Sequence, residues 1–305
     1  MKEPIKGLLD RQGAPTKEWA AKGIRAFVIK VKWRDIQSQP FGELDTSSID
    51  SLLGLCKQPG HYLYGSLVKL RVTAGVDTPG WVTYMSGSTY WGNPKASNSS
   101  VDNGFVPCFW TSAFYACYAH LQAKLAAKYD QDDTVRGIMV SGSSTLYDEA
   151  TARQFSDSPD NLHRAIVKGG YTFDKDVASI ADFCYLHEDV WQNTPSYAAL
   201  QPVSYGEGAF GVELRDRVAS YVNVGNHSLS SSKIADKNWT EFYVWLAKQK
   251  NAYIQTDSAN RIGDPKEVMI FAKSLMVDHV ELPQGYQKWS TDQFGGWLDS
   301  AQTLR

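Results

Sequence analysis

Eight short apolar segments, separated mostly by amphipathic helical stretches, are the feature that most constrains how this chain folds. Each segment is a continuous apolar run, as expected of a strand that is buried on both faces. Strands that alternate with helices are typical of parallel βαβ units. The predicted strands lie at residues 7–10, 26–33, 66–75, 134–143, 196–206, 220–229, 252–259 and 278–286.

The number of these units favours a closed barrel. Eight βα units in 305 residues fit a (β/α)8 barrel, which commonly fills about 250 residues as one domain. No GxGxxG or GxxxxGKS/T motif follows a predicted strand, so an open sheet that binds a nucleotide loses support. The sequence therefore predicts an α/β fold, a single (β/α)8 TIM barrel over residues 1–305, with a long loop insertion at 76–107 after the third strand.

Composition and charge exclude several classes of partner. The formal net charge of −2 gives no attraction to nucleic acid or anionic lipid. No apolar stretch approaches the roughly 20 residues that span a bilayer, and the amino-terminal segment lacks the apolar core of a signal peptide. We therefore expect a soluble protein, made in the cytoplasm, that binds no nucleic acid and does not insert into a membrane. Four scattered cysteines without a CxxC pair are expected to be buried thiols.

Polar and aromatic side chains follow the predicted strands at the point where each strand ends. The carboxyl ends of the strands of such a barrel form one mouth, which holds the active site. Amides and Arg hydrogen-bond sugar hydroxyls, and Trp faces stack on pyranose rings. The residues expected to bind a sugar there are Trp33, Arg71, Trp81, Asn226, His227 and Gln255. His227 and His279 stand on separate strands, with no second His at helical spacing, so no metal site is expected. No organic cofactor is expected either.

Three carboxylates are the candidates for catalysis. Cleavage of a glycosidic bond needs one carboxyl group to protonate the leaving oxygen and a second to attack or to activate water. Glu149 would be the acid, and Glu281 or Asp257 would be the nucleophile or general base. Each also has a structural interpretation. Glu149 would stabilise the start of the next helix, Asp257 would order a turn, and Glu281 would form an ion pair inside the mouth with Arg71.

The first third of the chain resembles the opening of clan-A (β/α)8 glycoside hydrolases, especially the β-galactosidase-like ones. Those proteins have a strand that ends in Trp, a turn with Pro, Gly and Asp that leads into a helix, and a strand with Arg that leads to P-x-W. Residues 27–53 and 67–82 follow this outline, and "ELP" at 281–283 resembles the end of the last strand. The matching residues are Trp33, Ile36, Pro40, Gly42, Asp45, Ile49, Asp50, Arg71, Pro79 and Trp81. The resemblance implies a barrel that hydrolyses a glycosidic bond in a polysaccharide.

The sequence departs from that family at both catalytic positions. The family carries its acid/base Glu after the fourth strand, usually in an Asn-Glu pair, and its nucleophile Glu at the end of the seventh. Here Glu149 lies several residues beyond the expected position, and Gln255 and Asp257 stand at the seventh strand. These departures favour a second hypothesis, a catalytically degenerate barrel that binds carbohydrate or has a structural role. A weaker resemblance, to glycosidase-like minor tail proteins of actinobacterial phages, implies a virion-associated protein that binds host cell-wall glycan and contacts other tail proteins.

Overall fold

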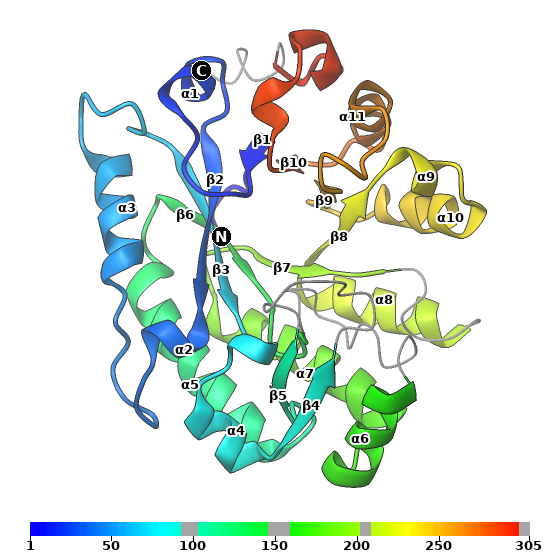
Figure 1. Ribbon diagram of the computed structural model, residues 1–305. Coiled ribbons are helices and arrows are strands. Elements are labelled where there is room, and N and C mark those ends of the chain that lie inside the picture. Colours follow the sequence, from blue (N-terminus) through cyan, green and yellow to red (C-terminus); the bar gives the residue numbers. More distant parts are fainter. Residues whose placement is uncertain (93–102, 146–158, 202–208, 299–305) are drawn as a thin grey trace.

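Eight parallel strands close into a barrel in the computed structural model, which describes residues 1–92, 103–145, 159–201 and 209–298. Each strand lies within one of the eight predicted segments, so the predicted (β/α)8 barrel is confirmed (Figure 1). Around the barrel the strands follow chain order, and the last pairs with the first. They are β1 (Gly7–Asp10), β2 (Ala26–Lys32), β3 (Leu67–Thr73), β6 (Val135–Met139), β7 (Ser196–Ala199), β8 (Asn223–Leu229), β9 (Tyr253–Thr256) and β10 (His279–Leu282).

Helices surround this barrel. The longer ones are α3 (Ser47–Lys57), α5 (Ser112–Tyr129), α6 (Pro159–Gly169), α7 (Phe173–Val190), α8 (Ala209–Tyr221), α10 (Lys237–Leu246) and α11 (Pro265–Ser274). Short ones are α1 (Lys17–Ala21), α2 (Trp33–Ile36), α4 (Gly80–Ser86) and α9 (Ser231–Ile234), with 3₁₀ turns η1 (Gly75–Asp77), η2 (Tyr286–Lys288) and η3 (Thr291–Phe294). Threonine side chains cap α5 and α7, accepting from the backbone N–H three residues on. Within the described residues, no helix combines the length and the apolar character needed to cross a bilayer.

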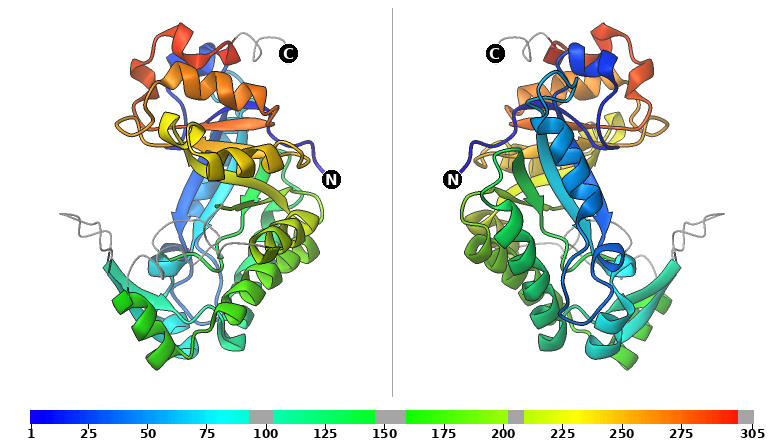
Figure 2. Two further views of the ribbon diagram at one scale, coloured as in Figure 1. Left: turned by 90° about the vertical axis from the view of Figure 1, so that its right-hand side faces the viewer. Right: turned by 90° about the vertical axis from the view of Figure 1, so that its left-hand side faces the viewer.

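The segment 76–107, expected to be an irregular loop, contains ordered elements. It holds α4 and an antiparallel hairpin of β4 (Ser88–Gly92) and β5 (Asn103–Pro107). Tyr90 and Phe105 face each other across the two strands, with ring centroids 5.7 Å apart, and such cross-strand pairs stabilise a hairpin. The hairpin and α6 lie together at the end of the molecule opposite α11 and η3 (Figure 2).

The inner and outer faces of the strands carry different residues. On β3, Val68, Leu70 and Val72 pack into the large cluster between the sheet and the helices, whereas Lys69 and Arg71 alternate with them and face the barrel interior. A small apolar cluster of Ile5, Leu9, Ala26 and Val28 lies inside the barrel near the start of the strands. The interior therefore holds charged side chains beside a small apolar cluster.

Two glycines make room for two large rings inside the barrel. A Cβ on Gly225 would lie 2.1 Å from a ring carbon of Tyr253, and one on Gly137 would lie 2.9 Å from the ring of Tyr197. Tyr253 cannot yield easily, because its ring stacks on His279 at 5.1 Å and its hydroxyl lies 3.0 Å from Nε2 of His227. Both positions therefore require glycine, because a large ring lies too close to the backbone to leave room for a Cβ.

We expect Gly225→Ala to lower the free energy of unfolding by about 2–3 kcal/mol through overpacking of the interior. Urea unfolding followed by circular dichroism measures this change. The matched control is Gly54→Ala in α3, where an added Cβ meets nothing within 4 Å, and this variant is expected to gain up to about 1 kcal/mol. Equal stabilities of the two variants would contradict the packing argument.

Candidate functional site

An ionic network crosses the interior of the barrel. The carboxylate of Glu281 on β10 accepts from Nζ of Lys69 at 2.8 Å and from Nη2 of Arg71 at 2.6 Å. Both cations stand on β3, which is separated from β10 by β1 and β2 in the sheet. The side chains of Lys69 and Glu281 are fully buried, and that of Arg71 is 4% exposed. The structure therefore contains the ion pair between Glu281 and Arg71 that the structural interpretation of Glu281 predicts.

The two cations determine the ionisation of Glu281. Burial alone would raise its pKa, but the charges of Arg71 and Lys69 outweigh burial and hold the pKa well below its usual range. The carboxyl group is therefore ionised at neutral pH, and each of its oxygens already accepts a charged hydrogen bond. A general acid needs the opposite condition, a raised pKa.

Lys69 is enclosed by aromatic rings. Its Nζ lies 3.4 Å from the ring centroid of Tyr253 and 4.3 Å from that of Tyr197, distances at which a cation is attracted to the ring face. Nζ also lies 3.2 Å from Nε2 of His279. Burial first, and the charge of Lys69 second, lower the pKa of His279 well below its usual value, so the imidazole is neutral and Nε2 accepts from the ammonium group.

The network reaches the mouth through Arg71. Its Nη1 donates to Oε1 of Gln255 on β9 at 3.2 Å, and Gln255 is partly exposed. Lys30 on β2 pairs with Arg71 in the strand register and is exposed. His227 on β8 joins the network through the hydroxyl of Tyr253. Three of the predicted sugar-binding residues, Arg71, His227 and Gln255, are thus brought together.

The other three predicted sugar-binding residues lie outside this network. Trp33 is 0% exposed, its indole N–H donates to Oε1 of Gln37, and it packs among aromatic rings in the layer between sheet and helices. Asn226 is also 0% exposed, and its amide is bonded to the carbonyl of Leu200 and the hydroxyl of Tyr243. The ring face of Trp33 and the amide of Asn226 are therefore not open to a ligand, which corrects the expectation that these two residues bind a sugar.

Trp81 belongs to the same outer layer but is less buried. Its ring packs edge-on against Trp33, with centroids 6.4 Å apart, and its indole N–H donates to the carbonyl of Gln37 at 3.2 Å. Phe41 covers another side at 5.6 Å. Trp81 therefore packs on the wall beside β2 and β3 and is not part of the network around Glu281.

The two remaining candidate acids differ from Glu281. Asp257 follows β9, forms an ion pair with Nη2 of Arg261 at 2.9 Å, and accepts from the backbone N–H of Ser258 at 2.7 Å. It orders the turn after the strand, as its structural interpretation predicts. Glu149 lies outside the described residues.

Sequence reasoning missed the part that Lys69 and the two tyrosines play in this network. The signal was present in "LVKLRVT", where Lys69 and Arg71 occur two residues apart between apolar residues. In a buried parallel strand this spacing places both cations on one face. The sequence suggests an ion pair of Glu281 with Arg71, but it does not suggest one with Lys69, which lies 212 residues from Glu281 in sequence.

Comparisons with known proteins bear on the fold. No protein-family model matches the chain, and no curated protein matches it in sequence. Solved structures do match. The catalytic domain of a β-amylase from Paenibacillus polymyxa has a TM-score of 0.63 at 8% identity, over 98% of both chains. An endo-β-1,4-glucanase from Xanthomonas axonopodis pv. citri has a TM-score of 0.53 at 12% identity, over 99% of this chain and 100% of that one.

A third solved structure comes from the class that the sequence resembles. A β-galactosidase from the psychrophilic Marinomonas ef1 has a TM-score of 0.59 at 10% identity. The match covers 99% of this chain, which spans only 59% of the β-galactosidase. At such low identities these likenesses show the fold alone. The chain is therefore a (β/α)8 barrel, the fold that it shares with these three solved structures.

Proposed function

We propose that this protein binds carbohydrate at the mouth of its barrel, and that Glu281 supports the site without cleaving the sugar. The observation that carries the proposal is the bonding of Glu281, whose two carboxylate oxygens accept from Lys69 and Arg71 inside the barrel. A carboxylate held between two cations neither donates a proton nor attacks a sugar carbon readily, because its charge is already stabilised.

Glu281 instead positions Arg71. The guanidinium group is held between the Glu281 carboxylate below and the Gln255 amide oxygen at the mouth. A planar group fixed in this way is preorganised, so little side-chain entropy is lost when a ligand binds. Gln255, with an amide that can both donate and accept, is the member of this set that we assign to a sugar hydroxyl.

The class of ligand is a polysaccharide or cell-wall glycan. The structural neighbours named above are a β-galactosidase, an endo-β-1,4-glucanase and a β-amylase, and such names support a carbohydrate ligand for a barrel of the same fold. Association with a virion and with other tail proteins stays a prediction from the sequence resemblance alone.

Hydrolysis is the second candidate function, and likeness to these three enzymes favours it. It would use Glu149 as the acid and a second carboxylate as nucleophile or base. Asp257 would have to leave its ion pair with Arg261 to take the second role.

The first experiment measures binding. Wild-type protein is screened on an array of β-linked and α-linked glucans, galactans and bacterial wall glycans, and the best ligand is titrated by calorimetry. Gln255→Ala is expected to weaken binding about 5- to 10-fold, the loss of one or two hydrogen bonds. The matched control is Gln58→Ala, at the exposed end of α3, which should bind like wild type. Absence of any glycan ligand would refute the proposal.

The second experiment separates binding from hydrolysis. The glycan that binds best is incubated with wild-type protein and with Glu149→Gln, and new reducing ends are counted. We expect binding without new reducing ends from either protein. Repeated turnover by wild type that Glu149→Gln abolishes would replace the binding function with hydrolysis.

A further inference from the structure

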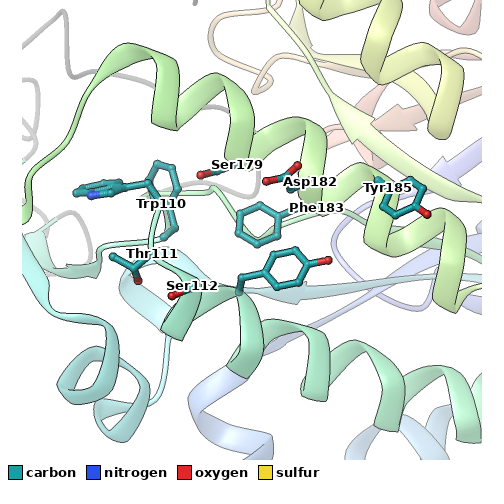
Figure 3. A pocket seen from close by; sticks show the side chains of 9 residues that line it. Trp110, Thr111, Ser112, Ser179, Asp182, Phe183 and Tyr185 are labelled. Carbon is teal, nitrogen blue, oxygen red and sulfur yellow. The ribbon is translucent and has the colours of Figure 1, made fainter.

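A pocket lies between α5 and α7, on the helical wall of the barrel. Its volume is about 410 Å³, within the roughly 300–1,000 Å³ typical of sites for small ligands. Figure 3 shows Thr111 and Ser112 at the start of one helix, and Ser179 and Asp182 on the other. None of the residues of the Glu281 network lines it, so this pocket is separate from the mouth.

Aromatic side chains form most of the lining. Tyr115 and Phe183 stack across the two helices, with centroids 6.0 Å apart and planes at 16°. Trp110 is fixed by its indole N–H, which donates to the carbonyl of Gly169 at 2.7 Å. Tyr185 is 55% exposed and rests edge-on against Tyr221. Among the rings of the lining, Trp110 and Tyr115 are partly exposed and Tyr185 is exposed, so these three can contact a ligand.

The charge of the pocket is negative. Asp182 is exposed on α7, and in the part of the chain that the structure describes it makes no ion pair and no hydrogen bond. Among the described residues that line the pocket, none is Lys or Arg. Burial raises the pKa of Tyr115 in the pocket wall, and the nearby charges of Asp182 and Asp189 raise it further.

We propose that this pocket binds an organic cation, an ammonium group that carries alkyl substituents. Ring faces attract such a cation and contact its alkyl groups, and the unpaired carboxylate of Asp182 supplies the opposite charge. An anionic ligand would meet only like charge. A neutral ligand would gain no attraction from the carboxylate.

The test compares a cation with its neutral isostere. Choline and 3,3-dimethylbutan-1-ol have the same shape, but only choline is charged, and binding of each to the whole protein is followed by calorimetry and ligand-observed NMR. We expect choline to bind at least 10-fold more tightly than the alcohol. Asp182→Asn and Tyr115→Leu should each weaken choline binding about 5-fold or more, the range of a cation–π contact or an ion pair. The matched control is Asp174→Asn, an exposed acid in the first turn of α7.

Three outcomes would overturn the proposal. They are no choline binding, equal binding of choline and the alcohol, and choline binding that Asp182→Asn leaves unchanged. The result is independent of the carbohydrate proposal, because Gln255→Ala should weaken glycan binding and leave choline binding as in wild type.

Discussion

Replacing Glu281 with Gln is expected to lower the free energy of unfolding by about 3–5 kcal/mol, the cost of breaking a buried ion pair from one side. The variant keeps the shape of the side chain but leaves Lys69 and Arg71 inside the barrel without their counter-charge. Chemical denaturation at pH 7 measures the change. A shift of this size would identify Glu281 as a structural residue whose charge the barrel interior requires.

Two further variants distinguish this loss of stability from the effect of removing a carboxylate elsewhere. Asp257→Asn removes an acid at the neighbouring strand end, but its partner Arg261 is 71% exposed, so we expect a loss of about 1 kcal/mol or less. Adding Lys69→Met to Glu281→Gln removes one unbalanced cation and should recover part of the lost stability. If Glu281→Gln is as stable as wild type but abolishes glycan cleavage, Glu281 is catalytic and our interpretation of the network is wrong.

The barrel itself could be predicted from the sequence because its strands are buried on both faces. Short segments rich in apolar residues, such as "AFVIKVK", mark most of the strands, and helical stretches between most of them favour parallel pairing. Segment 76–107 was harder, since β4 and β5 are short, and Ser, Asn and Gly around them are equally common in loops.

The site could be predicted only in part, because sequence locates the strand ends but not the direction of each side chain. Asn226 and His227 are neighbours on β8, so Asn226 faces the helices and His227 the interior, although the sequence predicts both at the mouth. Trp33 follows β2 directly, yet it begins α2, and its ring packs outward. Strict alternation along each strand would have separated Asn226 from His227, whereas the position of Trp33 depends on the packing of α5.

Asp176 is a buried acid whose surroundings are the reverse of those of Glu281. Its Oδ2 accepts from the hydroxyl of Tyr171 at 2.8 Å, and no described residue bonds its Oδ1. Burial raises the pKa of Asp176 from 3.8 to about 7, and the Tyr171 hydrogen bond only partly opposes this. The folded protein therefore holds a proton on this group at pH values where the unfolded chain has lost it.

This raised pKa makes stability fall as pH rises. Below pH 3.8 both states are protonated, between about 4 and 7 only the folded state is, and above about 7 neither is. Since one pKa unit is worth about 1.4 kcal/mol, the full loss is about 4 kcal/mol. Asp176→Asn cannot ionise, so its stability relative to wild type should grow by about 3 kcal/mol between pH 5 and pH 8. Urea unfolding at each pH measures the difference.

The pH dependence distinguishes ionisation from the other effects of an amide at this position. A lost or gained hydrogen bond in Asp176→Asn changes stability by the same amount at every pH, whereas the ionisation term changes only between about pH 4 and pH 7. A constant difference between Asp176→Asn and wild type across this range would mean that the buried carboxyl is ionised in the fold, with a cation or water supplying the partner that burial otherwise denies it.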